Sequence, residues 1–357
     1  MHLLTTLKEN SIAAMPNTQN TRLEKLEMRT RSKRTHQQEI FSFEKDRVGT
    51  RNEYQVVSMF SGCGGMDLGF LGGFEIFDRR YERLPFKIIW ANEHNPAACR
   101  TYRRNLKEHI HCADVWDAIE TMPRKTDVLI GGFPCQDISV NGKRAGVNGR
   151  RSGLYRAMIE GIKRTRPRVF IAENVKGLLM KAHEGSIRQV LHDFGKLGYE
   201  ISFKLYLAAD YGIPQTRERI FIVGTSPKAK PFVPPPAERT KATWMSAKEA
   251  LADLEFVAEC PSINHVWSRA NKSPEQGNRR LAADRPGYTI RAECHGNIQY
   301  HYRLPRRISM REAARVQSFP DSFIFDSKLR ETERQVGNAV PPVLAWHVAR
   351  AVCACLA

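Results

Sequence analysis

Short apolar runs alternate with amphipathic stretches between residues 55 and 224. The apolar runs have the length and flanking turn residues of buried strands, and they lie at 55–60, 87–93, 127–135, 168–175, 201–208 and 219–224. Helical periodicity predicts helices at 95–105, 152–167, 185–198, 309–319 and 341–357. Strands that alternate with helices predict an α/β fold with a doubly wound, mainly parallel sheet covered on both faces.

Changes in composition divide the chain into four parts. Residues 1–53 are polar and basic and are interpreted as an extension, with one loose helix expected at 21–38. Residues 54–225 carry the alternating pattern and form the predicted main domain. Residues 226–305 are rich in Pro, Asn, Arg and His and predict a smaller, loop-rich domain. Residues 306–357 regain helical periodicity and are expected to return to the main domain.

The chain is strongly basic. Its 357 residues include 56 Lys and Arg against 38 Asp and Glu, which gives a formal net charge of +18. Such an excess attracts polyanions, and nucleic acid is the commonest large polyanion in a cell, although a generically basic enzyme is also consistent with charge alone. The N-terminus lacks a basic start followed by an apolar segment, and no apolar run approaches the roughly 20 residues that span a bilayer. We expect a cytoplasmic protein.

The eight cysteines are scattered, without a C-x-x-C pair or a regular spacing. This pattern predicts neither a disulfide framework nor a metal site, and it favours a reducing compartment. Cys135 differs from the other seven because it lies in FPCQ, at the end of a predicted buried strand and before a polar loop. It could be a buried structural thiol, a redox thiol, a metal ligand or a nucleophile.

Several polar side chains end predicted strands and are therefore expected along one edge of the sheet. The glycines of FSGCGGMDLGF (60–70) occupy a strand-to-helix turn, where a ligand can approach bare backbone. Glu93 ends the next strand, where a carboxylate can hold two ribose hydroxyls, and Asp114 is placed to accept from an adenine amino group. Cys135 and Glu173 end two further strands and should open onto the same crevice. A thiol beside a carboxyl group favours a nucleophile with an acid partner.

An ordered series of eight motifs then resembles the DNA (cytosine-5)-methyltransferases of the bacterial restriction–modification type. The motifs are FSGCGG, ANEH, ADVWD, GGFPCQ, ENVKGLL, QTRERIFIVG, REAARVQSFPD and QVGNAVPP, in that family's own order. The resemblance covers residues 55–355. It implies a class I S-adenosylmethionine-dependent methyltransferase fold, Rossmann-like, in which 54–225 is the catalytic and cofactor-binding domain and 226–305 the target-recognition domain.

The resemblance also implies a reaction, in which a methyl group passes from S-adenosylmethionine to C5 of a flipped-out cytosine in a short duplex DNA sequence. Cys135 would attack C6 while Glu173 donates a proton to N3, which requires a carboxyl pKa raised by burial. Arg217 and Arg219 would hold the base through its carbonyl oxygen, and Asn174 would order the loop that carries Cys135. The implied cofactor-binding residues are Phe60, Gly62, Cys63, Gly64, Gly65, Glu93, His94, Asp114, Val115, Pro134, Leu154, Asn338 and Ala339.

A base that leaves the duplex must be replaced by something that fills the hole and holds the strand. The loop after Cys135 supplies groups suited to this: Gln136, Ser139, Asn141, Lys143 and Arg144. In the recognition region, Thr289 resembles the family's threonine beside the flipped nucleotide. Candidates for base or phosphate contacts there are Arg269, Asn271, Lys272, Asn278, Arg279, Arg280, Arg291 and His295. The DNA sequence that they read stays open.

Two other functions compete with DNA methylation. The first is methylation of RNA cytosine, but the tRNA-directed branch carries a Cys-Phe-Thr sequence in its recognition region that this chain lacks. The second is an inactive DNA-binding homologue, which the intact Cys135, Glu173, Arg217 and Arg219 argue against. The prediction is therefore a DNA cytosine methyltransferase that acts as a monomer on duplex DNA and releases S-adenosylhomocysteine. Whether a cognate restriction endonuclease is encoded alongside, or the methylase is an orphan, stays open, and the extension at 1–53 leaves room for autoregulation or an extra DNA contact.

Overall fold

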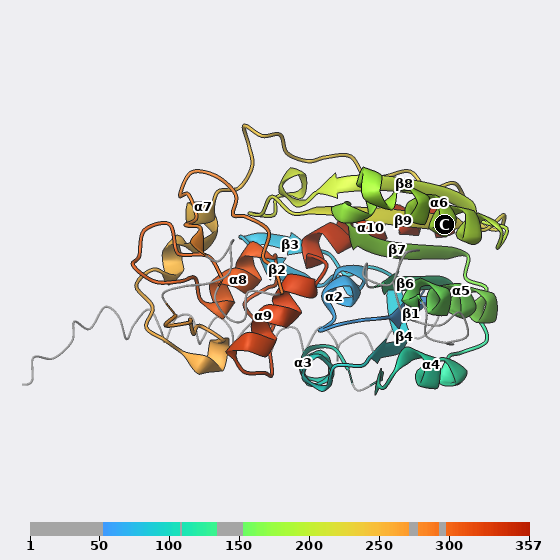
Figure 1. Cartoon of the computed structure of the whole chain (residues 1–357), viewed down its shortest axis with the longest axis horizontal. Helices are drawn as coiled ribbons and strands as arrows, with labels where there is room; N and C mark the ends of the chain where they lie inside the picture. The colour runs from blue at the N-terminus through green and yellow to red at the C-terminus, as the bar shows by residue number, and fades with distance from the viewer. Residues whose placement is uncertain (1–52, 108, 134–152, 271–277, 293–297) are drawn as a thin grey trace, which may run out of the picture.

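A seven-stranded sheet forms the centre of the protein (Figure 1). The computed structural model describes residues 53–107, 109–133, 153–270, 278–292 and 298–357. The strands, in the order in which they lie side by side, are β5 (Ile110–Cys112), β4 (Phe86–Glu93), β1 (Tyr54–Met59), β6 (Val128–Gly132), β7 (Val169–Val175), β9 (Glu218–Thr225) and β8 (Glu200–Leu207). Neighbours from β5 to β7 are parallel, and β9 is antiparallel to both β7 and β8. The predicted mainly parallel sheet is confirmed.

Helices cover both faces of this sheet. Successive side chains of a strand point to opposite faces, so Val56 and Val128 belong to one buried cluster while Val57 and Leu129 belong to another. The first cluster includes side chains of α2 (Gly65–Leu71), α3 (Pro96–Asn105) and α10 (Pro342–Leu356). The second includes side chains of α4 (Val115–Ala118), α5 (Leu154–Thr165) and α6 (Glu184–Gly195). This is the doubly wound arrangement that the sequence predicts.

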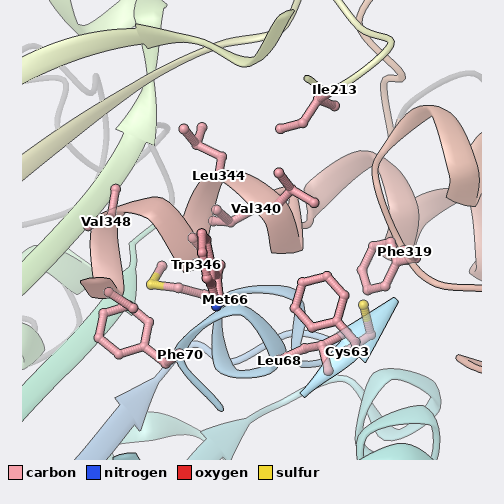
Figure 2. Close-up of a cluster of buried hydrophobic side chains, with 14 of the residues drawn as sticks. Cys63, Met66, Leu68, Phe70, Ile213, Phe319, Val340, Leu344, Trp346 and Val348 are labelled. Atoms are coloured by element: carbon pink, nitrogen blue, oxygen red, sulfur yellow. The ribbon is translucent and has the colours of Figure 1, made fainter. Parts of the chain in front are cut away.

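The helices α2 and α10 pack with their backbones almost in contact. A Cβ atom on Gly65 would lie 2.5 Å from the carbonyl oxygen of Val340, and one on Gly69 would lie 2.5 Å from that of Pro342. Any side chain on this face of α2 would push the helices apart. Larger side chains fill the space around the contact, and Figure 2 shows Met66, Phe70, Leu344 and Trp346 among them. The contact brings the C-terminal helix against the glycine-rich turn that precedes α2.

Local signals in the sequence set several helix boundaries. Asn95 caps α3, because its side-chain oxygen accepts hydrogen bonds from the N–H groups of Ala97 at 2.8 Å and Ala98 at 3.2 Å. The helix α5 ends at Thr165, before Pro167, as expected. The strand predicted at 127–135 is described as β6, and its last two predicted residues lie outside the described ranges. The helix expected at 21–38 also lies outside them.

Some elements are absent from the sequence-based prediction. They are the hairpin of β2 (Phe74–Ile76) and β3 (Arg79–Tyr81), the edge strand β5, and the helices α4, α7 (Ala247–Leu251) and α9 (Leu329–Asn338). All but α9 are too short to show a periodicity, and α9 is mostly polar.

By length and composition alone, the stretch Leu329–Leu356 could cross a membrane, but its most apolar window is 78% buried inside the protein. It comprises α9 and α10, and α10 belongs to the core.

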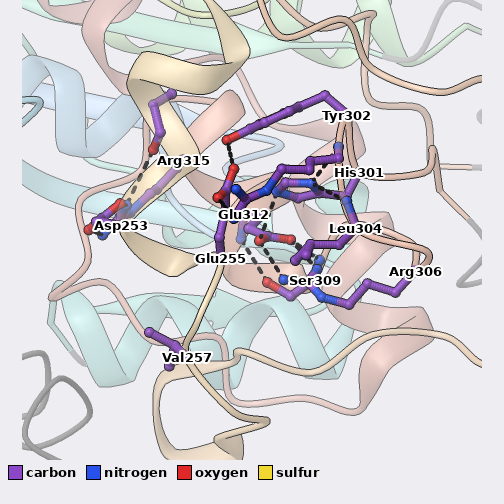
Figure 3. A network of polar contacts seen from close by, with 12 residues as sticks. Asp253, Glu255, Val257, His301, Tyr302, Leu304, Arg306, Ser309, Glu312 and Arg315 are labelled. Carbon is purple, nitrogen blue, oxygen red and sulfur yellow. Dashed lines mark hydrogen bonds and ion pairs between the residues drawn. The ribbon is translucent and has the colours of Figure 1, made fainter. Parts of the chain in front are cut away.

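The segment between β9 and α8 (Met310–Val316) has few regular elements and a small apolar cluster of its own, Leu254, Val257, Cys260 and Ile263. A polar network fixes this segment to α8 (Figure 3). Glu312 is fully buried and accepts two hydrogen bonds from the Arg306 guanidinium, at 2.7 and 2.9 Å. Arg315 pairs with Asp253 and Asp321. Buried charges are tolerated here because each has a partner of opposite sign.

The substitution Gly69→Ala tests the α2–α10 contact. Its Cβ would meet two backbone atoms closer than 3.0 Å, the oxygen of Pro342 and the nitrogen of Trp346, neither of which can rotate away. We expect the free energy of unfolding to fall by about 1–3 kcal/mol in urea denaturation. The matched control is Gly195→Ala in α6, where a Cβ meets no atom within 4 Å. The control should be neutral or more stable by up to about 1 kcal/mol. Equal effects of the two substitutions would contradict the close packing.

Candidate active site

The glycine-rich turn after β1 is held by the carboxylate of Glu93. The N–H of Gly62 donates to Oε2 at 3.0 Å, and the N–H of Asn95 donates to Oε1 at 2.8 Å. Gly62 and Gly64 have φ angles of 57° and 93°, which glycine adopts without strain. A Cβ on Gly64 would lie 2.4 Å from a methyl group of Leu106, whereas one on Gly62 would meet no atom within 4 Å. The turn is therefore packed on one side and open at Gly62.

Three half-buried apolar side chains pack against the second core cluster: Phe60, which directly precedes the turn, Trp116 of α4 and Leu154 at the start of α5. Asp114 caps α4, and its side-chain oxygen accepts from the N–H of Trp116 at 2.9 Å. The indole nitrogen of Trp116 is buried and has no hydrogen-bond partner among the described residues. Trp116 is not among the residues predicted to bind the cofactor, although it lies inside the ADVWD motif.

The remaining predicted cofactor residues divide into buried and exposed groups. Val115 and Cys63 are buried, and burial raises the pKa of the Cys63 thiol, which therefore stays protonated. Ala339 packs against Gly65, while Asn338 is exposed at the end of α9. His94 is exposed, and its Nδ1 lies 3.1 Å from Oε1 of Glu93, a hydrogen bond that raises the pKa of His94. Pro134 lies outside the described residues.

This set of residues fits a nucleoside. Open backbone at Gly62, a carboxylate at Glu93, half-buried aromatic rings and an indole N–H without a partner are the groups that bind a ribose and a base. Oε2 of Glu93 accepts one backbone N–H, from Gly62, and keeps a second lone pair for a hydroxyl, whereas Oε1 accepts from the N–H of Asn95 and also lies 3.1 Å from Nδ1 of His94.

A second group of polar side chains lies farther along the same edge of the sheet. Glu173 at the end of β7 and Arg219 in β9 form an ion pair, with 2.9 Å between Nε and Oε1, and each side chain is only 10% exposed. Gly132 lies opposite Glu173 in the β6–β7 register, and a Cβ there would come within 2.9 Å of Oε2. Burial raises the pKa of Glu173, although Arg219 and Arg217 act in the opposite direction. The carboxyl group therefore holds its proton more readily than an ordinary glutamate.

The chain approaches Cys135 beside this carboxyl group. The Asn174 amide donates to the carbonyl oxygen of Phe133 at 2.9 Å, and Phe133 lies two residues before Cys135. Cys135 itself and the predicted DNA-contacting residues Gln136, Ser139, Asn141, Lys143 and Arg144 lie outside the described residues.

Arg217 has contacts that the sequence does not predict. Its side chain is fully buried and donates to the carbonyl oxygens of Ile290 at 2.9 Å, Gly337 at 2.7 Å and Ala339 at 3.1 Å. Gln215 is also buried and joins the same segments, accepting from the N–H of Ile290 at 2.9 Å. Arg217 thus ties the start of β9 to residues 337–339 beside the glycine-rich turn. Its predicted contact with a base stays a prediction.

Among the residues of the recognition region that are predicted to contact DNA, some are exposed and others already have partners within the protein. The Thr289 hydroxyl donates to the Thr216 carbonyl at 3.2 Å, so Thr289 lies next to Arg217, and Arg291 is exposed. Others have partners within the protein: Arg269 pairs with Glu259, Arg279 stacks on Tyr288, and Arg280 donates to the carbonyls of His301 and Leu304. Asn271, Lys272 and His295 lie outside the described residues.

Comparison with known proteins identifies the class of enzyme. Residues 54–256 and 240–354 match the family model of the C-5 cytosine-specific DNA methylases. The chain is 32% identical over 335 residues to the type II methyltransferase M.NgoFVII of Neisseria gonorrhoeae, covering 84% of this chain and 87% of that protein. It is 32% identical over 336 residues to the type II methyltransferase M.FnuDI of Fusobacterium nucleatum, covering 84% and 94%.

Solved structures share the fold. The Dnmt2 methyltransferase of S. pombe superimposes with a TM-score of 0.63 at 18% identity, covering 84% of this chain and 98% of that one. A putative DNA modification methyltransferase encoded within an E. coli prophage gives 0.61 at 21% identity, covering 84% and 98%. The chain belongs to the C-5 cytosine-specific DNA methylases and is a DNA cytosine-5 methyltransferase, so the predicted family and fold are confirmed.

The substitution Arg217→Lys tests whether Arg217 mainly holds the fold together. A lysine ammonium cannot reach carbonyl groups on two separate segments, so buried carbonyls would lose their donors. We expect the free energy of unfolding to fall by about 2–3 kcal/mol in urea. The comparison is Arg219→Lys, which keeps a positive charge beside the buried Glu173 and should therefore cost less stability than Arg217→Lys while slowing methyl transfer. A fully stable but inactive Arg217→Lys protein would argue against the tying role.

Proposed function

We propose that this protein transfers a methyl group to C5 of a cytosine that has been flipped out of duplex DNA, through a covalent bond between Cys135 and C6. The observation that carries the proposal is the buried Glu173–Arg219 pair at the end of β7, with the chain entering the Cys135 loop beside it through the Asn174–Phe133 hydrogen bond. These contacts support a nucleophile and an acid acting on one ring.

Glu173 is suited to donate the proton that the reaction needs. When the thiolate of Cys135 attacks C6, the electrons of the C5–C6 double bond shift onto C5 and, through C4, onto N3. The negative charge that develops at N3 must then be neutralised by a proton. A carboxyl group whose pKa is raised by burial holds its proton more readily than an ordinary glutamate and is suited to donate it to N3. Arg219, whose Nε pairs with Glu173, keeps other guanidinium donors for the carbonyl oxygen of the base.

The second half of the reaction restores the base. S-adenosylmethionine supplies a methyl group activated by its positively charged sulfur, and C5 accepts that methyl group. The transfer leaves S-adenosylhomocysteine. Loss of the C5 proton then re-forms the C5–C6 double bond and expels the thiolate of Cys135, and N3 returns its proton to Glu173, so the enzyme is restored. Water is the proposed acceptor of the C5 proton.

Phe60, Gly62, Glu93, Trp116 and Leu154 would hold S-adenosylmethionine. A ribose hydroxyl would hydrogen-bond to the free lone pair on Oε2 of Glu93, and the adenine would lie among Phe60, Trp116 and Leu154. Asp114 is proposed to contact the adenine end. The cofactor site and the Glu173 site share the carboxyl edge of the parallel strands, which is where ligands bind in sheets of this kind.

The DNA is proposed to be a duplex with a short recognition sequence, and the residues 226–305 to read it. Flipping a base costs a few kcal/mol of stacking and pairing, which contacts from the loop at 136–144 would offset. The net charge of +18 supports binding to phosphates. Because the similar proteins of N. gonorrhoeae and F. nucleatum are type II methyltransferases, we propose that this enzyme acts in the cytoplasm as the protective methylase of a restriction–modification system and binds DNA as a monomer.

Transfer of labelled methyl groups from S-adenosylmethionine to unmethylated genomic DNA tests the function. We expect label at C5 of cytosine within one short sequence, and a rate lower by a factor on the order of 10³ or more for Cys135→Ser, which lacks the thiolate nucleophile. The matched control is Cys353→Ser, a half-buried thiol in α10 that should leave the rate unchanged. Label in tRNA but not in DNA would instead favour an RNA methyltransferase, and DNA binding without any transfer would favour an inactive homologue.

A further inference from the structure

A buried carboxylate lies beneath the glycine-rich turn and has no task in the reaction proposed above. Asp67 is in the first turn of α2, and its side chain is fully buried. The Tyr102 hydroxyl donates to Oδ1 at 2.8 Å, and the Ser58 hydroxyl donates to Oδ2 at 3.0 Å. Three elements, β1, α2 and α3, therefore meet at one carboxyl group.

Hydrogen bonds connect this carboxyl group to the turn. The Ser58 and Ser61 hydroxyl oxygens are 2.9 Å apart, and the Ser61 hydroxyl also lies 3.1 Å from the Ser58 carbonyl oxygen. The Ser61 carbonyl accepts from the N–H of Gly64 at 2.9 Å, which closes the turn. Gly62 directly follows Ser61 in the turn, and its N–H donates to Glu93. A displacement of Asp67 would therefore reach Glu93 through Ser58, Ser61 and Gly62.

Tyr102 supports the same turn by direct packing. A Cβ atom on Gly64 would lie 3.0 Å from the Tyr102 ring, so the ring forms part of the surface on which the turn rests. The hydroxyl that holds the ring in place is the one that donates to Asp67.

We propose that Asp67 is a positioning residue, whose carboxylate acts through Ser58 and Tyr102 to fix residues 61–64 in the conformation that binds S-adenosylmethionine. This inference rests on the proposed function, because it assigns the turn to the cofactor. Asp67 does not touch the cofactor in this proposal, and its effect is on affinity rather than on the methyl transfer step.

The charge of Asp67 should change close to neutral pH. Burial raises the pKa of Asp67 to about 6, although the hydrogen bonds from Tyr102 and Ser58 lower it. The other titratable groups around it are Tyr102, the Cys63 thiol and His109, with Glu93 beyond the turn. Where α10 packs on α2, backbone atoms and the side chains of Ala339 and Ala345 meet the glycines.

Protonation would rearrange the network. An ionised Asp67 accepts from both hydroxyls, as observed, whereas a protonated one has a proton to donate and gives up one of these acceptor positions. Tyr102 has an alternative partner, because His109 Nε2 lies 3.3 Å from its hydroxyl, and burial lowers the pKa of His109, which favours the neutral ring. The affinity for the cofactor should therefore fall as the pH drops through about 6.

The stability of the fold should show the opposite trend with pH. A raised carboxyl pKa means that the folded state binds more protons between pH 3.8 and about 6, so this group's contribution to stability is lost as the pH rises through that range.

Calorimetric titration of the full-length protein with S-adenosylhomocysteine across this pH range tests the proposal. For Asp67→Asn we expect about tenfold weaker binding above pH 7, since a hydrogen bond to a charged group is lost. The step in affinity near pH 6 that the wild type shows should disappear. In methyl-transfer assays the variant should raise KM for S-adenosylmethionine and leave kcat at saturating cofactor within about twofold.

The substitution Tyr102→Phe gives an independent readout that does not depend on how Asp67→Asn folds. Without the Tyr102 hydrogen bond, the pKa of Asp67 should rise, and the pH midpoint of cofactor binding should move upward with it. The matched control is Tyr206→Phe, because Tyr206 has a buried hydroxyl with no partner among the described residues. It should leave affinity and midpoint unchanged.

The possible outcomes separate this inference from the proposed function. If wild type and both variants bind with the same affinity and the same pH midpoint, Asp67 is not a positioning residue, and the proposed function stands. If the wild type itself does not bind S-adenosylhomocysteine, the cofactor assignment fails first. If Asp67→Asn does not fold, an unchanged midpoint for Tyr102→Phe overturns the inference and an upward shift supports it.

Discussion

The close contact between α2 and α10 is the constraint on which the rest of the structure depends. Gly65 and Gly69 have no side chains, so the backbone at Val340 and Pro342 can lie directly against α2. This places residues 337–339 beside the glycine-rich turn, where Arg217 donates to the carbonyls of Gly337 and Ala339. Arg217 is two residues before Arg219, which pairs with Glu173. One helix contact therefore connects the proposed cofactor site to the proposed reaction site.

Three carboxyl groups near one edge of the sheet have different environments, and the environments decide what each can do. Glu93 accepts backbone N–H groups from two segments, and its Oε2 remains available to a hydroxyl. Glu173 is buried beside a guanidinium, and its raised pKa suits a proton donor. Asp67 is buried beneath the turn, and its side chain accepts hydrogen bonds from the hydroxyl groups of Ser58 and Tyr102. The same chemical group is thus suited to the different roles proposed here, in binding, proton transfer and positioning, because burial and partners differ.

Much of this arrangement could be predicted from the sequence because it depends on local patterns. Apolar runs predict the strands, Asn95 and Pro96 predict the start of α3, and parallel strands bring their carboxyl ends to one edge. The roles of Arg217 and of Arg306 with Glu312 could not be predicted in this way. Their partners are backbone carbonyls or side chains supplied by other segments, and no periodicity indicates which carbonyls a buried arginine will meet. Asp67 was missed for a related reason, since an acidic residue in the first turn of a helix is usually an exposed one.

The proposed mechanism requires that Cys135 and the buried acid Glu173 act on the same cytosine ring. The most direct measurement uses duplex DNA in which the target cytosine carries fluorine at C5, because loss of a proton from C5 is then impossible and the covalent species cannot be released. Incubation with enzyme and S-adenosylmethionine should give a stable protein–DNA complex. Digestion and mass spectrometry should then locate the base on Cys135 and the methyl group on C5. A complex linked through another residue, or methyl transfer to ordinary DNA without any complex on the fluorinated duplex, would contradict this mechanism.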